Sequence, residues 1–493
     1  MPVVIAAIVA VVVPAIVPAI ISLVVSVVVD VVIEKFFGSD EIETRDEVQA
    51  QAQAAARARA LLVNKNSNNA GIPLVYGKYR MGGVRVYLET SNGNGSIADN
   101  DAGNEYFNMV LAMCEGEMGN IRELYFGDIL VWSGNGQDTG SGYQLSSYAG
   151  GNEYSDADKT IRYHNGSANQ GVDSMMQTSV GSSRWGSNHR LRGVAYLAIK
   201  LKANAEAYAG GVPVITAVLE GKDIPDVQYL SQGQTGNVAV EEGADQNPAN
   251  VIYDYLTNTT YGKGLDHTDT GTYSAGLDID LASFKQARLD CNAAWNGAGI
   301  VFNGPLSTEQ KLFENIQRLT KACNGMLIWT GGKYKLIIQH ANETSKYSFD
   351  EDNIIGQMSV QKAKKASRVN KVTAGFTDSA LNYVDNISVK DDATALAEDN
   401  GTVLGVQTDH QLSTNKAFVD RMSEYRIAKT RNQMSIAFNS THASLKVECG
   451  DIVSVSQKAL NWTNKLFRVV TLEINEKDEV VFGAIEYVPS IQI

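Results

Sequence analysis

The chain shows two contrasting patterns of apolar and polar positions. Residues 2–29 carry no charged side chain, and Ser22 and Ser26 are their only polar side chains. From about residue 68 onward, short runs rich in valine, isoleucine and tyrosine alternate with turns of glycine, asparagine and aspartate. Such runs are typical of β-strands joined by tight turns. The pattern therefore predicts a mainly β body behind an apolar N-terminal segment.

The N-terminal segment is long enough to cross a membrane. As a helix, residues 2–29 would extend roughly 40 Å, and the apolar core of a bilayer is about 30 Å thick. The segment lacks the basic region and the cleavage site of a secretory signal. Pro14 and Pro18 each remove a helix hydrogen bond that lipid cannot replace. Two interpretations stay open: a transmembrane anchor, or a helix that several copies bundle along the axis of an oligomer.

The side chains expected to line such a bundle, or to enter a membrane, are spread along residues 1–36. They are Val3, Ile5, Ile8, Val12, Ile16, Ile20, Leu23 and Val27. A second helix is expected over residues 37–63, because its acidic residues come early and its arginines late, which suits the helix macrodipole. Its apolar positions are mostly alanine, so we interpret it either as a connector that packs against other elements or as a lone solvated helix.

The first part of the body has the pattern of two β-hairpins. The first would pair Ile72–Tyr76 with Val84–Glu89 through a Met-Gly-Gly turn. The second would pair Phe107–Met113 with Ile121–Val131. These two hairpins would form one curved antiparallel sheet. Residues 132–190 are dominated by glycine, serine, asparagine and aspartate, and they are interpreted as a loop-like insertion into this β-domain.

Helical periodicity appears in the second half of the body. It predicts helices over residues 247–258, 278–295, 307–323 and 413–430. Ser307 and Gln310 have the spacing of a capping box. The apolar face expected for that third helix consists of Leu312, Phe313, Ile316 and Leu319. A β-hairpin with a Thr-Gly-Gly-Lys turn is predicted over residues 326–338, and strands return from residue 366.

Composition narrows the classes of function. The chain has 493 residues, which suggests three or four domains. Its net charge is −13, and no cluster of lysine and arginine is present, which argues against a surface that grips nucleic acid. Its cysteines form no CxxC pair, which argues against a zinc site or a disulfide framework. They are Cys114, Cys291, Cys323 and Cys449.

Candidate chemistry is sparse, and we expect no catalytic residue, no metal site and no cofactor. Asp99, Asp101, Gly103 and Glu105 only loosely resemble a calcium loop, because the EF-hand acids at positions 5 and 12 are missing. The histidines lack the HExxH spacing of a zinc protease, and a structural or surface role is expected for each. They are His164, His189, His267, His340, His410 and His442.

Several stretches, in order, resemble one family of virion proteins. They are IPLVYGKYRMGGVRVYLET (72–90), MVLAMCEGEMGNIRELYFGD (109–128), residues 191–224, NPANVIYDYLTNTTYGKGL (247–265), LFENIQRLTKACNGMLIWTGGKYKLII (312–338) and residues 395–455 with a Gly-Asp-Ile-Val strand start. Together they resemble the central tail hub, or tip attachment, proteins of long-tailed bacteriophages, relatives of the lambda host-specificity protein. The resemblance spans about residue 60 to the end, and each stretch alone is weakly specific.

This resemblance implies a structural virion protein at the tail tip, assembled in the host cytoplasm. Such proteins form homotrimeric rings with two tube-like β-domains per chain, so that three chains match a hexameric tube above and a trimeric tip below. The expected fold is mainly β, with barrel or tube-like hub domains, an α+β module and the N-terminal apolar helix. The expected parts are residues 1–36, 37–63, 64–235 with the insertion 132–190, 236–365 and 366–493.

The resemblance also implies partners. They are the tail tube ring or distal tail protein, the C-terminus of the tape-measure protein, DNA that passes during ejection, and the host envelope on contact with the apolar N-termini. The chain ends at Ile493, just after the last hub-like stretch, so receptor binding is expected to belong to a separate fibre or tip protein. An acidic channel would not retain phosphates. The alternatives are a membrane-anchored glycan-degrading enzyme, which needs two opposed carboxylates, and a surface adhesin.

Overall fold

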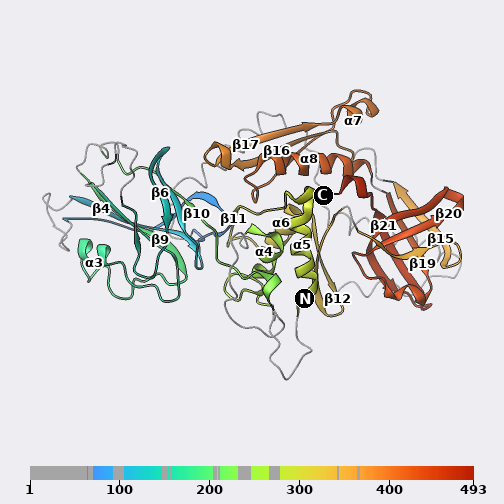
Figure 1. The fold of residues 1–493 in the computed structure, drawn as a ribbon, viewed down its shortest axis with the longest axis horizontal. Coiled ribbons are helices and arrows are strands. Elements are labelled where there is room, and N and C mark those ends of the chain that lie inside the picture. Colours follow the sequence, from blue (N-terminus) through green and yellow to red (C-terminus); the bar gives the residue numbers. More distant parts are fainter. Residues whose placement is uncertain are drawn as a thin grey trace, which may run out of the picture.

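The structure is a computed structural model. It describes residues 64, 70–92, 105–146, 154, 158–203, 208, 211–230, 246–265, 278–340, 343–362, 367–432 and 434–492. The described part is mainly β, as predicted. Figure 1 shows β-sheets at the two ends of an elongated molecule and helices between them. None of the described helices is long and apolar enough to span a membrane. The N-terminal segment with Val3 to Val27 lies outside the described residues.

The β-structure at the left of Figure 1, here called the first β unit, comprises residues 79–219. One sheet has the order β3-β4-β9-β8-β7 and the other the order β2-β10-β5-β6. Their strands are β2 (Tyr79–Gly82), β3 (Val84–Ser91), β4 (Tyr106–Glu115), β5 (Ile121–Phe126), β6 (Ile129–Gly136), β7 (Tyr143–Gln144), β8 (Lys159–His164), β9 (Val194–Lys202) and β10 (Ile215–Leu219).

The two sheets face one another across a shared apolar core. Met109, Leu111 and Leu197 come from the first sheet, and Leu124 and Ala217 from the second. Both edges of the pair are connected covalently, because β2 continues into β3 through one residue and β6 into β7 through a short loop. Helix α3 (Ser174–Val180) covers the outer face of the first sheet, where Met176 and Trp185 pack against Tyr196.

The predicted strands of this unit are confirmed, but their predicted pairing is wrong. Strand β2 pairs with β10, β3 pairs with β4, and β1 (Leu74–Tyr76) pairs with β11 (Gly304–Leu306). The physical reason lies at Gly83, where a Cβ would sit 2.9 Å from the carbonyl oxygen of Ala112. The backbone passes so close to β4 here that the chain changes sheets instead of folding back as a hairpin. The stretch 121–131, predicted as one arm of the second hairpin, instead begins a hairpin of its own, which β5 and β6 form over residues 121–136.

Helices α4 (Pro248–Thr257), α5 (Leu281–Gly297) and α6 (Leu312–Ala322) form the central module. The predictions for these helices are confirmed to within a few residues. Asn247 caps α4 through its side chain, which accepts a hydrogen bond from the amide of Ala249, and Pro248 occupies the first turn. Helix α4 is buried from Pro248 to Leu256, so it forms the centre of the largest core. The predicted hairpin of β12 (Gly325–Thr330) and β13 (Lys333–Ile338) is confirmed, and it packs against α5 and α6.

Helix α6 departs from the prediction in its start and its face. It begins at Leu312, its N-cap Lys311 makes no side-chain cap bond, and the Ser307–Gln310 capping box does not form. Leu319 is buried, but Leu312 is 40% and Phe313 61% exposed. Asn315 is buried instead and donates to the hydroxyl of Tyr255 at 2.9 Å and to the carbonyl of Ser307 at 2.9 Å. Asn315 thus takes a core-facing position on the same helix as the buried Leu319, while Ile316 packs against that core as predicted.

A three-stranded sheet and helix α8 form a layer along the top of Figure 1. The strand order is β17-β16-β18, and α8 packs against β16 and β17. The central strand supplies Val372, Ala374 and Phe376 to the same core as the central helices. The elements are β16 (Lys371–Asp378), η6 (Ser379–Leu381), β17 (Val384–Asp391), α7 (Ala393–Glu398), β18 (Gly405–Asp409) and α8 (Lys416–Arg431).

The second β unit, at the right of Figure 1, is one six-stranded sheet around its own core. Its order is β14-β20-β21-β22-β19-β15. The two edge strands are neighbours in sequence, because a tight turn of four residues joins them and the amide of Ile354 donates to the carbonyl of Asp350. The strands are β14 (Ser345–Phe349), β15 (Ile354–Lys362), β19 (Met434–Ser440), β20 (Ile452–Gln457), β21 (Trp462–Ile474) and β22 (Val480–Glu486).

The expectation of closed barrels is wrong. Among the described residues, no sheet pairs its first strand with its last. In the first β unit, closure is replaced by covalent connections between the edges of two sheets. In the second, the sheet curls until its edges meet at one turn, but β14 pairs in parallel with β20 alone. Both units therefore enclose a core as a barrel does, without a continuous ring of hydrogen bonds.

Candidate functional site

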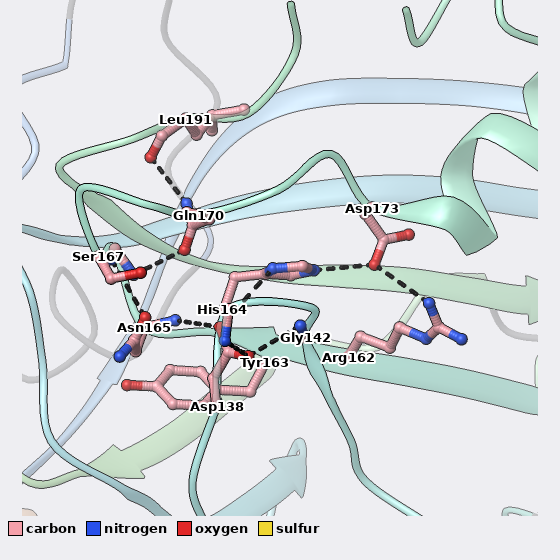
Figure 2. Close-up of polar contacts among 12 residues, drawn as sticks. Asp138, Gly142, Arg162, Tyr163, His164, Asn165, Ser167, Gln170, Asp173 and Leu191 are labelled. Atoms are coloured by element: carbon pink, nitrogen blue, oxygen red, sulfur yellow. Dashed lines mark hydrogen bonds and ion pairs between the residues drawn. The ribbon is translucent and has the colours of Figure 1, made fainter. Parts of the chain in front are cut away.

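A buried polar network lies inside the first β unit, in the stretch predicted as a loop-like insertion. His164 ends strand β8 and is 0% exposed. Figure 2 shows its imidazole between Asp138, from the glycine-rich stretch after β6, and Asp173, which precedes α3. Its Nε2 lies 2.8 Å from Asp173 Oδ2, and its Nδ1 lies 3.9 Å from Asp138 Oδ2. No motif or spacing in the sequence brings these three residues together.

Asp138 organises the glycine-rich loop. Its Oδ1 accepts hydrogen bonds of 2.8 Å from the amides of Gly140 and Gly142, and its Oδ2 accepts one from the amide of Asn165. Gly142 has φ +85, and a Cβ there would sit 2.6 Å from His164 Nε2. Only glycine allows the loop to close over the imidazole in this way.

Asp173 connects the histidine to helix α3. Its Oδ1 accepts from the amide of Met176, which makes Asp173 the N-cap of the helix. Its Oδ2 lies 3.8 Å from the guanidinium of Arg162, which also donates to the hydroxyl of Ser174. The second carboxylate of the network thus fixes a helix start and a histidine at once.

Stacking and amide bonds complete the network. The ring of Tyr196 is stacked on His164, with centroids 4.3 Å apart. Gln170 accepts from the amide of Gly166 and donates to the carbonyls of Arg190 and Leu191. The C-terminal end of the insertion is thereby hydrogen-bonded to its centre. The imidazole is enclosed by protein groups, so the arrangement suits a structural anchor rather than a site that solvent or substrate reaches.

A second polar network lies where the first β unit meets the central module. Asp254 of α4 accepts hydrogen bonds of 2.7 Å from the hydroxyls of Tyr76 and Tyr261. Lys222 Nζ lies 3.9 Å from Asp254 and 4.9 Å from the centroid of the Tyr261 ring. Burial and the nearby carboxylate raise the pKa of Tyr76 well above its usual value, so its hydroxyl stays a donor. Burial also raises the pKa of the neighbouring Glu115.

The other residues that the sequence raised as candidates do not assemble into a site. His189 and His442 are exposed, whereas Asp99, Asp101, Gly103 and His267 lie outside the described residues. In the described part of the chain, no group of three or more histidine, cysteine or acidic side chains could hold a metal. All four cysteines are free thiols.

One part of the chain matches a known protein family, and the fold of most of the chain is similar to that of a solved structure. Residues 313–471 match the sequence model of a family described as "Putative phage tail protein". No curated protein matches the sequence. The fold is similar to that of a chain in the virion of the native gene transfer agent particle, with a TM-score of 0.57, 13% sequence identity, and coverage of 87% of each chain.

Two further solved structures align at lower similarity. The 43 kDa tail protein of prophage MuSo2 from Shewanella oneidensis has a TM-score of 0.32 and 12% identity, and the alignment covers 85% of this chain and 96% of that one. The tail protein from Neisseria meningitidis MC58 has a TM-score of 0.31 and 10% identity, with coverage of 86% and 97%.

Proposed function

We propose that this chain, whose residues 313–471 belong to the phage tail protein family, is the subunit of a trimeric hub that closes the distal end of a phage tail tube. The family match and the similarity of the fold to a virion chain support a structural protein of the virion tail. The finer assignment rests on one structural observation. The chain carries two separate β units, each with its own core, at opposite ends of one molecule (Figure 1).

The two β units give a physical reason for the trimer. Three chains with two β units each present six units in a ring, which matches a six-fold tube on one side. The same three chains keep three-fold symmetry for the tip on the other side. The neighbours in this proposal are the tail tube ring or distal tail protein, the tape-measure protein, and separate receptor-binding proteins.

The acidic balance and the apolar N-terminus extend the proposal to ejection. A net charge of −13 would keep a channel wall from binding the phosphates of passing DNA. Residues 2–33, which lie outside the described residues, would gather near the three-fold axis, where an uncharged valine- and isoleucine-rich segment is shielded from water. On infection they would contact the host envelope.

The proposal is tested by counting and locating this chain in purified tails. Quantitative mass spectrometry should give three copies per tail, and so half the number of subunits in one hexameric tube ring. Cryo-electron microscopy should place them at the end distal to the capsid. Six copies per tail, or a position along the tube, would overturn the hub assignment but leave the chain a tail protein.

A further inference from the structure

The turn between β16 and β17 has an unusual backbone. Asn382 has φ 56 and Tyr383 has φ 61, so two successive residues other than glycine lie in the left-handed region. Asparagine visits this region readily, but a bulky aromatic residue rarely does. Strained residues of this kind persist only where surrounding contacts impose them.

The chain contains a close counterpart of this turn without the second left-handed residue. Ser379–Leu381 is a 3₁₀ turn that ends at Asn382, and Lys458–Leu460 is a 3₁₀ turn that ends at Asn461 with φ 55. Both turns read Ala-Leu-Asn followed by an aromatic residue. Trp462 enters strand β21 directly, with an ordinary φ. The turn itself therefore does not demand a left-handed aromatic residue, and something else holds Tyr383.

Contacts with the first β unit hold Tyr383 in its left-handed conformation. Tyr383 is 8% exposed and belongs to the core of that unit, although it comes from the layer above the central module. Its ring meets Tyr79 edge-on, with centroids 5.9 Å apart. The hydroxyl of Tyr79 lies 3.0 Å from Thr377 Oγ1, and Arg80 donates to the carbonyl of Asn382 at 3.2 Å. Strand β2 and the strained turn are thus connected by an aromatic contact and by two hydrogen bonds.

The same boundary is crossed by two backbones at glycines. Gly77 joins β1 to β2 and has φ +66, and Gly221 follows β10. A Cβ on Gly221 would sit 2.3 Å from the amide nitrogen of Gly77, and a Cβ on Gly77 would sit 2.2 Å from the carbonyl oxygen of Phe302. The two crossings are in backbone contact and form a narrow pivot between the first β unit and the central module.

We propose that the β16–β17 turn is a strained latch, and that it holds the first β unit in one of two positions about a hinge at Gly77 and Gly221. With the Tyr383 ring inserted beside Tyr79, the unit is fixed. When the ring leaves, residue 383 returns to an ordinary backbone conformation and the unit turns about the two glycines. Relief of strain on release makes the device bistable rather than continuously flexible.

This inference concerns the single chain and goes beyond the hub function. It holds whether or not three chains form a ring, so failure of the stoichiometry experiment leaves it intact. If the chain is a hub subunit, the latch supplies a second position for one of its two β units. The residues that carry it are Tyr79, Thr377, Tyr383 and the two glycines.

The latch is tested by trypsin cleavage after Lys78, an exposed residue within the hinge. Tyr383→Ala and Tyr383→Asn remove the ring from the first β unit, and Trp462→Ala removes the aromatic residue of the counterpart turn. We expect cleavage of the full chain after Lys78, followed by mass spectrometry, to become roughly tenfold faster in both Tyr383 variants, because an edge-on aromatic pair and its buried area are lost. Trp462→Ala should cleave there at the rate of the unaltered chain.

Tyr79→Phe covers the case in which a Tyr383 variant does not fold. It keeps the ring and removes only the hydroxyl that meets Thr377, and we expect a few-fold increase in cleavage after Lys78. Hydrogen exchange of Tyr79–Gly82 should rise with it, while exchange in β20 and β21 stays unchanged. Equal cleavage in the Tyr383 and Trp462 variants, or no change in Tyr79→Phe, would overturn the latch.

Discussion

The hydroxyl of Tyr76 donates a 2.7 Å hydrogen bond to Asp254 Oδ2, although 178 positions separate the two residues in sequence. Tyr76 lies on β1, whose Val75 points into the core of the first β unit while Leu74 and Tyr76 point into the central core. One three-residue strand thus serves two cores. The bond fixes that strand from the central side.

Loss of this hydroxyl should weaken the junction between the two parts. A buried hydrogen bond to a carboxylate contributes about 1.5–3 kcal/mol, so we expect Tyr76→Phe to lower the free energy of unfolding by that amount. Urea unfolding of the full chain measures it. Tyr347→Phe, at a half-buried tyrosine of the second β unit, is the matched control and should change stability by less than about 0.5 kcal/mol. Equal effects of both substitutions would contradict the role given to Tyr76.

The loop over His164 makes a sharper comparison possible, because two glycines of the same loop differ in one respect. Gly140 and Gly142 both have positive φ, but a Cβ on Gly142 would sit 2.6 Å from His164 whereas one on Gly140 meets nothing within 4 Å. Both alanine substitutions carry backbone strain, and only Gly142→Ala adds a steric clash. We expect Gly142→Ala to be less stable than Gly140→Ala by about 1–3 kcal/mol. Thermal unfolding of the two variants checks this, and equal midpoints would show that the loop yields to the side chain.

The helices show what the sequence could predict about this fold. Asn247 and Pro248 start α4 by local chemistry, so its position could be predicted from a few neighbouring residues. The exposure of Phe313 on α6 could not be predicted in this way. Asn315 is buried instead, because it donates a hydrogen bond to Tyr255, which is 60 positions away. Periodicity finds a helix, but the side that faces the core depends on partners that the pattern does not contain.

The buried site was missed for a related reason. Asp138, His164 and Asp173 come from three separate stretches, and a pairing across such intervals has no signal in spacing. One local signal was present, because Asp173 precedes the short helix α3 in the position of an N-cap. The aspartate inside the glycine-rich stretch 134–142 also fits a residue that binds successive loop amides. Neither signal points to His164.

The acid sensitivity of the fold should depend on His410. Burial, with a smaller contribution from Arg426, lowers the pKa of His410 to about 4. An unfolded histidine has a pKa of about 6.5. Between these values the unfolded chain binds a proton that the folded chain does not, so stability is complete above about pH 6.5 and falls as the pH drops toward 4.

His410→Gln should remove this contribution. Between pH 7 and pH 4.5, the free energy of unfolding should fall by about 1–3 kcal/mol less in the variant than in the unaltered chain. The difference stays within this range because the side chain is partly exposed, and solvent screening reduces the effect of its pKa shift on stability. Urea unfolding at several pH values measures it. His442→Gln, at an exposed histidine, is the control and should leave the pH profile unchanged. Parallel profiles for His410→Gln and the unaltered chain would exclude His410 as the source.

The thiols should be inert in the folded chain. Burial raises the pKa of Cys114 and of Cys323 to about 12, and it raises that of Cys291 well above its usual value. A thiol reagent acts on the thiolate, so at pH 8 we expect these three residues to react only after unfolding. Cys449 is half-buried, and any early labelling should disappear in Cys449→Ser. Rapid labelling of Cys291 or Cys323 in the folded chain would show that the central core opens locally.

The apolar character of the N-terminal segment should be needed for a functional tail. An uncharged run such as residues 2–29 promotes aggregation when it is exposed to water, and in the proposed hub an oligomer or a membrane would cover it. Deletion of residues 2–33 leaves every described residue in place. We therefore expect the shortened chain to fold and enter tails, but those tails should release DNA early or fail to infect.

Ile16→Asp and Ile16→Leu separate a requirement for apolar character from one for length alone. A charge within an apolar bundle or a bilayer is expensive, whereas leucine is not. Infectivity should fall in Ile16→Asp and in the deletion and remain normal in Ile16→Leu, as plaque counts on purified particles would show. Normal DNA retention and infection by the deletion variant would mean that the segment has no role in the closed tip.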